Sequence, residues 1–119
     1  MIVIEEEEDL LKAHVYGEFQ LDDFRELERA VTGELTRYEQ VLLLLDLRAA
    51  RGFTVDVALE EIQFNRRHLG DYRRIAVVTD SQWLAFTSWL AGMFTGAEVS
   101  RFATLEDAEA WLRGLPAPG

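Results

Sequence analysis

The chain has 119 residues, of which 49% are hydrophobic and 29% charged, with 8 Gly, 2 Pro and no Cys. This size suits one globular domain with a single hydrophobic core and excludes a multidomain enzyme, and the composition excludes a low-complexity protein. Disulfides and thiol chemistry are excluded as well, and the net charge of −10 argues against nucleic acid as a partner, because like charges repel.

The first two predicted strands form a hairpin. Residues 1–4 are a β-branched run, and residues 10–16 alternate loosely between apolar and polar side chains. The acidic run at 5–9 is expected to form the turn and, through its like charges, to discourage pairing of this edge with other chains. We expect the second strand to end at Gly17.

An amphipathic helix is predicted at residues 21–35. Its acidic first turn suits the helix dipole. Apolar side chains recur at helical spacing at Leu21, Phe24, Leu27, Val31 and Leu35.

Two continuous apolar runs predict strands that are buried on both faces. The first is VLLLL at 41–45, closed by Asp46 and followed by an expected loop at 48–52. The second lies at 74–79, and a short last strand is expected at 98–102.

Three more helices separate and follow these strands. Thr54 is placed to cap a helix over 55–69, and the uncharged stretch 81–97 forms the next one. Thr104 starts the last helix, at 105–115.

The predicted order is therefore β-β-α-β-α-β-α-β-α. This order predicts an α/β fold with a five-stranded mixed, mostly parallel sheet and four helices, which should cover both faces of the sheet. The hairpin supplies the antiparallel edge. We expect one domain over residues 1–115 and a tail at 116–119.

The polar residues indicate no catalytic chemistry. His14 and His68 are the only imidazoles, and their contexts favour a strand-face residue and a helix C-cap. Asp46 and Asp80 follow predicted strands, which is typical of turn and cap residues; the less favoured alternative is a carboxylate pair for the acid–base chemistry of a hydrolase. We therefore predict no enzyme activity, no catalytic residue, no metal site and no cofactor.

Arginines form one basic cluster, for which two interpretations stay open. It is either a solvated helix end and loop or a contact for an anionic headgroup or a partner's acidic patch. Its members are Arg66, Arg67, Arg73 and Arg74.

The segment 81–97 contains no formal charge. It is too short and too polar for a membrane span, yet apolar side chains nearly encircle it, so more than its own sheet should cover it. Three alternatives for what covers this segment stay open: the rest of its own chain, a symmetric partner chain, or an apolar ligand or membrane surface. The candidate contact residues are Trp83, Phe86, Trp89, Leu90, Met93 and Phe94, with Val57, Ile62 and Phe64 of the preceding helix as a second wall.

Several segments, in their order and spacing, resemble the SpoIIAA-like family of small bacterial proteins, also described as STAS-like or CRAL-TRIO-like. They are Gly17 with LDDF at 21–24, VLLLLDL at 41–47, Phe53 with Thr54, His68, Tyr72, RIAVVTD at 74–80, Trp83, Val99, Arg101, Phe102 and EAWL at 109–112.

The resemblance implies the same five-stranded sheet with four helices, a non-enzymatic role and dimerisation. For some relatives it also implies binding of nonpolar ligands or of a membrane. Relatives that antagonise anti-sigma factors use a phosphorylatable Ser at the turn after the third strand. This sequence has RAARGFT at 48–54 there, so only Thr54 could serve.

These observations predict a binding or regulatory module. The leading hypothesis is binding of a nonpolar small molecule, or transient membrane contact, through 81–97. The alternative is partner switching with a regulatory protein, controlled at Thr54. The acidic first residues lack the basic region of a secretory signal, so we expect a cytoplasmic protein. We also expect a homodimer, and peripheral membrane contact under the leading hypothesis.

Overall fold

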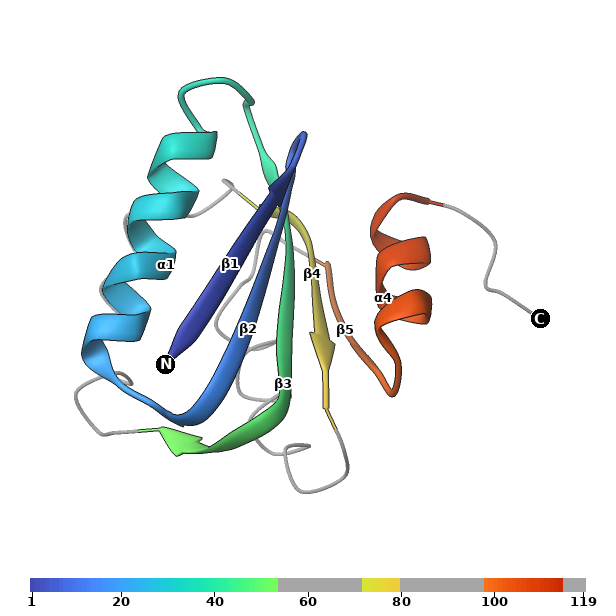
Figure 1. Cartoon of the computed structure of the whole chain (residues 1–119). Coiled ribbons are helices and arrows are strands. Elements are labelled where there is room, and N and C mark those ends of the chain that lie inside the picture. Colours follow the sequence, from blue (N-terminus) through green and yellow to red (C-terminus); the bar gives the residue numbers. More distant parts are fainter. Residues whose placement is uncertain (54–71, 80–97, 115–119) are drawn as a thin grey trace.

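Five strands form one mixed sheet with the order β1-β2-β3-β4-β5. The computed structural model describes residues 1–53, 72–79 and 98–114 (Figure 1). The elements are β1 (Ile2–Glu7), β2 (Leu10–Phe19), α1 (Leu21–Glu34), β3 (Val41–Phe53), β4 (Tyr72–Val78), β5 (Glu98–Phe102) and α4 (Leu105–Leu112). Strands β1 and β2 pair in antiparallel fashion, and every other pair is parallel. The predicted α/β fold and the antiparallel edge are confirmed.

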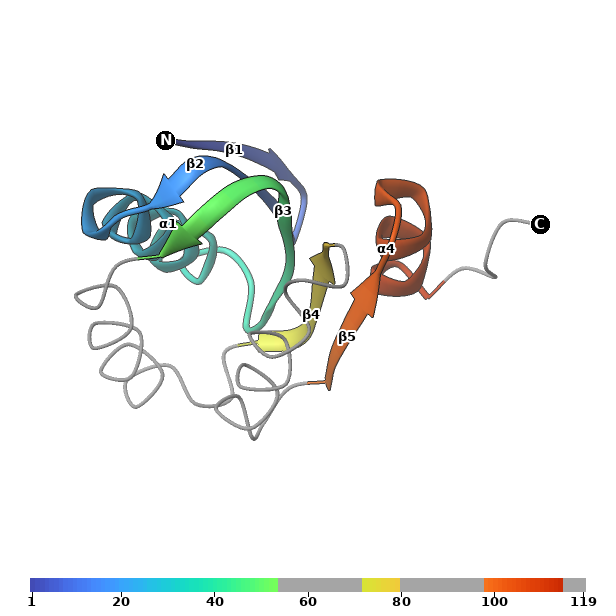
Figure 2. The same ribbon diagram turned by 90° about the horizontal axis from the view of Figure 1, so that it is seen from below.

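The two helices of the described part cover opposite faces of the sheet (Figure 2). Phe24, Leu27 and Val31 of α1 pack on one face, and Ala108 and Leu112 of α4 pack on the other. Coverage of both faces is confirmed. The two helices predicted over 55–69 and 81–97 lie outside the described residues, so two of the four predicted helices are seen.

The apolar run at the start of β3 supplies both hydrophobic layers. Because side chains alternate along a strand, Leu43 and Leu45 join the layer under α1, while Leu42 and Leu44 join the layer under α4. Leu44 is fully buried. The continuous run therefore forms a strand buried on both faces, as predicted.

The first hairpin is longer than predicted. Strand β1 continues through Glu7, so the turn is confined to Glu8 and Asp9, with Glu8 at φ 54°. Two glutamates of this strand have cationic partners, since Nζ of Lys12 lies 3.1 Å from Glu7 and Nη2 of Arg37 lies 3.6 Å from Glu6. Strand β2 also continues past Gly17, whose φ of 71° marks a register irregularity beside β3.

The loop predicted at 48–52 is wrong, because β3 runs on to Phe53. The extended end of β2 offers this segment a pairing partner: Tyr16 pairs with Ala49, and Phe19 with Phe53. The backbone N–H and C=O groups of these two long neighbouring strands thus hydrogen-bond with each other, whereas in a loop they would hydrogen-bond with water.

The last helix begins as predicted and ends earlier. The side chain of Thr104 accepts a hydrogen bond from the backbone N–H of Asp107, which is an N-cap. The helix ends at Leu112, three residues before the predicted end, because Gly114 adopts a left-handed φ of 71°.

Glu34, at the end of α1, gives the first prediction. It has 0% exposure, and burial raises its pKa; Glu6 adds to this, and Arg37 opposes it. Folding therefore favours the protonated form, so its ionisation costs stability as the pH rises through the raised pKa.

We expect Glu34→Gln to raise the free energy of unfolding at pH 7 by about 1 kcal/mol. Urea denaturation should show that the gain shrinks as the pH is lowered towards 4. Glu26, exposed on the same helix, provides the control Glu26→Gln. A gain of the same size in both variants would contradict the assignment to buried charge.

Candidate functional site

The carboxyl end of β3 extends far beyond that of β4. The last β3–β4 pair joins Asp46 to Val78, whereas β3 and β2 stay paired as far as Phe53. Thr54 is the next residue in the chain. We call the segment 46–53 the β3 extension. Since ligand sites of α/β proteins gather at the carboxyl ends of the strands, it is the candidate site.

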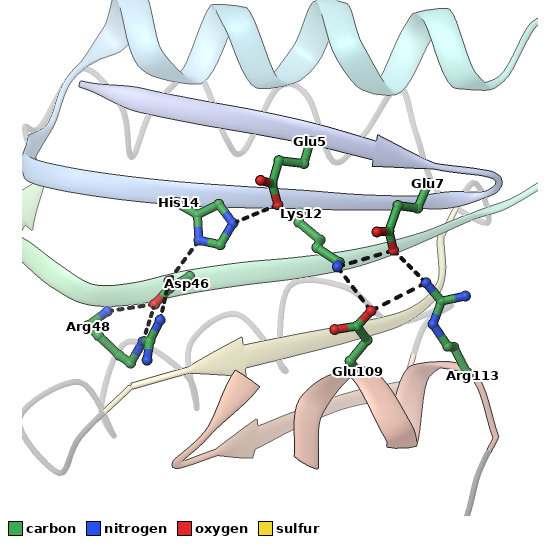
Figure 3. Close-up of polar contacts among 8 residues, drawn as sticks. All are labelled: Glu5, Glu7, Lys12, His14, Asp46, Arg48, Glu109 and Arg113. Atoms are coloured by element: carbon green, nitrogen blue, oxygen red, sulfur yellow. Dashed lines mark hydrogen bonds and ion pairs between the residues drawn. The ribbon is translucent and has the colours of Figure 1, made fainter. Parts of the chain in front are cut away.

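A charged cluster lies at the base of the β3 extension (Figure 3). Nε and Nη2 of Arg48 donate to the two carboxylate oxygens of Asp46 at 2.9 and 3.0 Å. Nδ1 of His14, on β2, lies 2.8 Å from Oδ2 of Asp46, and its Nε2 lies 3.4 Å from Oε2 of Glu5 on β1. Three adjacent strands are therefore joined on one face of the sheet.

The local sequence explains why these groups meet. Asp46 and Arg48 are two residues apart on one strand, so their side chains point to the same face. His14 is the direct cross-strand partner of Asp46. The backbone N–H of Arg48 also donates to Oδ1 of Asp46 at 3.1 Å, which holds the carboxylate in place.

The cluster stabilises the ionised form of Asp46. Burial alone would raise the pKa of this carboxyl group, but the hydrogen bonds from Arg48 and His14 outweigh it, and the pKa is lowered. The same contact raises the pKa of Arg48. The side chain of Asp46 is only 9% exposed, whereas that of Arg48 is 49% exposed. The outer face of the cluster is therefore a guanidinium that solvent or a partner can reach.

Exposed apolar side chains adjoin this cluster. Met1, Val3 and Tyr16 are the exposed large hydrophobic residues of the described segments. Val3 lies opposite His14, and the N–H of Tyr16 donates to the carbonyl of Met1 at 2.8 Å. The surface around His14 thus combines apolar and charged groups.

A second ion-pair network fixes α4 against the hairpin (Figure 3). Nζ of Lys12 lies 3.1 Å from Glu7 and 2.9 Å from Glu109, and Nη2 of Arg113 lies 2.6 Å from Glu7. Burial lowers the pKa of Lys12, but the two glutamates outweigh it and the pKa is raised. The network anchors the helix that covers this face.

The sequence predictions for the site have mixed outcomes. His14 is a strand-face residue, as predicted, whereas the turn predicted at Asp46 is wrong because Asp46 lies within β3. The cluster itself was missed. The available signal was the opposite charge of Asp46 and Arg48 at a spacing of two residues.

Most of the other candidate residues lie outside the described ranges. Thr54 comes directly after β3, in the stretch 54–71 that the structure does not describe; Asp80 directly follows Thr79. The remaining candidates are also outside the described ranges: Val57, Ile62, Phe64, Arg66, Arg67, His68, Trp83, Phe86, Trp89, Leu90, Met93 and Phe94.

Two features of the described residues bear on the chemistry. In 1–53, 72–79 and 98–114, no group of three or more His, Asp or Glu side chains is arranged to hold a metal ion. Neither helix within those ranges has the length and apolarity needed to cross a membrane.

The fold is a small α/β domain built on one mixed five-stranded sheet. The SpoIIAA-like family model matches residues 10–113, and the chain belongs to this family. By sequence, no curated protein gives a match.

Solved structures share the fold. An uncharacterised protein of the DUF3478 family with a SpoIIAA-like fold, from Shewanella loihica, has a TM-score of 0.74 at 21% identity, over 94% of this chain and 92% of that one. The anti-sigma factor antagonist SpoIIAA in its unphosphorylated form has a TM-score of 0.62 at 13% identity, over 97% and 100%. An anti-sigma factor antagonist from Mycobacterium paratuberculosis has a TM-score of 0.61 at 19% identity, over 95% and 93%.

The lowered pKa of Asp46 predicts a pH-dependent contribution to stability. The contribution is present above the ordinary aspartate pKa of about 3.9 and is lost as the pH falls through the lowered pKa. We expect Asp46→Asn to reduce the free energy of unfolding at pH 7 by about 2 kcal/mol, and the deficit to shrink at pH 3.

Denaturant titrations at both pH values measure this difference. The exposed Asp22 provides the control Asp22→Asn, which should cost no more than about 0.5 kcal/mol. If the Asp46→Asn deficit were equal at pH 7 and pH 3, the ionised carboxylate would not be its source.

Proposed function

We propose that this protein is a non-enzymatic regulatory module that acts by binding another protein. The observation that carries the proposal is the fold match to two anti-sigma factor antagonists over nearly the whole chain, together with membership of the SpoIIAA-like family. We take residues 1–115 as the single domain that does this.

The β3 extension and Thr54 are the proposed contact and control points. Arg48 and the neighbouring Val3 and Tyr16 offer a mixed charged and apolar surface. Thr54 follows the last residue of β3, and Arg51, three residues earlier, is exposed. A phosphate on Thr54 would add about two negative charges to the residue that directly follows β3, and we propose that this change of charge controls the protein contact.

Thr54→Glu tests the proposal. We expect the charged side chain to reduce the recovery of a specific protein partner about tenfold, because it places a fixed negative charge at the control point. Affinity purification of the tagged full chain from its native cells, with quantitative mass spectrometry, measures the recovery.

Thr54→Ser is the matched control, because it keeps the hydroxyl group and should retain the partner. Identical protein profiles for the wild type and Thr54→Glu would contradict control at this position. A wild type that enriches no protein over a tag-only control would contradict protein binding itself.

A second function is favoured by the uncharged segment 81–97. We propose that it binds a nonpolar small molecule or a membrane surface through Trp83, Phe86, Trp89, Leu90, Met93 and Phe94, with Val57, Ile62 and Phe64 as a second wall. Covering one such aromatic side chain removes about 150–250 Å² from water, so an apolar cover is strongly favoured. The protein would then be cytoplasmic with peripheral membrane contact, and a homodimer is the competing cover.

Liposome flotation and native mass spectrometry of the purified full chain test this second function. The wild type should float with the vesicles or carry a bound lipid, and Trp89→Gln should reduce the floated fraction at least about threefold. Tyr16→Gln, which alters an aromatic residue outside 81–97, should leave flotation unchanged. A protein that neither floats nor carries lipid would overturn the proposal, and a dimer mass without lipid would assign the segment to the partner chain.

A further inference from the structure

A cavity of about 340 Å³ opens at the amino ends of the parallel strands. It lies at the opposite end of the sheet from the β3 extension, because β2, β3 and β4 run in the same direction. Its volume is at the lower end of the range for small-molecule sites, which begins at about 300 Å³. It is lined by Glu8, Asp9, Leu42, Arg73, Arg74, Leu112, Arg113 and Gly114.

One wall of the cavity is cationic. The side chain of Arg73 is exposed and makes no hydrogen bond or ion pair within the part of the chain that the structure describes. Nη1 of Arg74 donates to the carbonyl of Trp111 at 2.6 Å, and its Nε lies 3.7 Å from Oε2 of Glu98. Nη2 of Arg113 donates to Glu7 and to Glu109. Since each guanidinium has five N–H donors, all three arginines retain donors for an anion.

The other part of the lining, the acidic wall, consists of Glu8 and Asp9. Glu8 and Asp9 form the β1–β2 turn, where Glu8 has a left-handed φ of 54°, a conformation that non-glycine residues seldom adopt. The carbonyl of Asp9 accepts the N–H of Leu42 at 2.9 Å, which ties the turn to β3. In the described ranges neither carboxylate makes a side-chain hydrogen bond or ion pair, so both are available to a ligand.

The two walls together determine the ligand chemistry. A simple anion would meet the two carboxylates, and a simple cation would meet the three guanidinium groups. A ligand with a compact anionic group and an ammonium group a few ångströms away satisfies both walls. Leu42 and Leu112 provide an apolar contact for the short carbon linker between them.

We propose that this cavity binds a small zwitterion, with its phosphate or carboxylate group on Arg73, Arg74 and Arg113 and its ammonium group on Glu8 and Asp9. The site is separate from Thr54 and from 81–97, so it stands whether or not the proposed functions hold. The same chemistry occurs in free phosphoethanolamine and in the headgroup of phosphatidylethanolamine.

Isothermal titration calorimetry of the full chain with three probes tests the proposal. Phosphoethanolamine should bind at least about fivefold more tightly than inorganic phosphate or ethanolamine alone, because only it engages both walls. Equal affinities for phosphoethanolamine and phosphate would contradict the assignment of a zwitterion as the ligand. If none of the probes bound, the cavity would not be a binding site.

Two substitutions separate the walls. Arg73→Gln should weaken phosphoethanolamine and phosphate alike by about tenfold, whereas Asp9→Asn should weaken only phosphoethanolamine, by about fivefold, and leave phosphate as tight or tighter. The control is Arg51→Gln, which removes an exposed arginine at the other end of the sheet and should change neither affinity. If Arg73→Gln had no more effect than Arg51→Gln, the cavity would not be the binding site.

Flotation with phosphatidylcholine vesicles, with and without phosphatidylethanolamine, distinguishes the source of the ligand. Recruitment that requires phosphatidylethanolamine and is lost in Arg73→Gln identifies a lipid headgroup. Calorimetric binding of free phosphoethanolamine without recruitment identifies a soluble zwitterion. Either result supports the site, and recruitment that Arg73→Gln leaves unchanged would exclude the lipid source.

Discussion

The contact of Asp46 with Arg48 and His14 keeps a charged segment inside the sheet. A carboxylate that is 9% exposed would be costly without partners, but here both oxygens accept hydrogen bonds from Arg48, and His14 binds one of them from the next strand. The contact lets β3 continue for seven residues beyond its last pair with β4. Thr54 is the next residue in the chain after this extension.

The polar contacts divide the α4 face of the sheet into two regions. On one side the network of Lys12, Glu7, Glu109 and Arg113 binds α4 to the hairpin. On the other side, around His14, the sheet carries the exposed Tyr16 and Val3. The α4 face therefore has one region held by ion pairs and another with exposed apolar side chains. The cavity proposed to bind a zwitterion lies at the amino ends of the parallel strands, beside the end of α4.

Sequence patterns predicted the architecture because apolar periodicity is a local signal. VLLLL at 41–45 had to be a strand buried on both faces, and the spacing of Phe24, Leu27 and Val31 had to be a helix. The same reasoning failed at Asp46 and at 48–52, where polar residues suggested a turn. The partner that makes them compatible with a strand, His14, is 32 residues away, and no local pattern records such a pairing. The early end of α4 depends on the left-handed backbone of Gly114. The sequence pattern did not predict this conformation.

We infer that Asp46 holds the β3 extension in the sheet, directly before Thr54, the proposed control point. Amide hydrogen exchange of Asp46→Asn tests this most directly, because it reports local opening residue by residue. The account predicts that residues 48–53 lose protection about tenfold or more while residues 42–45 and 75–78 keep theirs. Unchanged protection at 48–53, or an equal loss along the whole of β3, would contradict it.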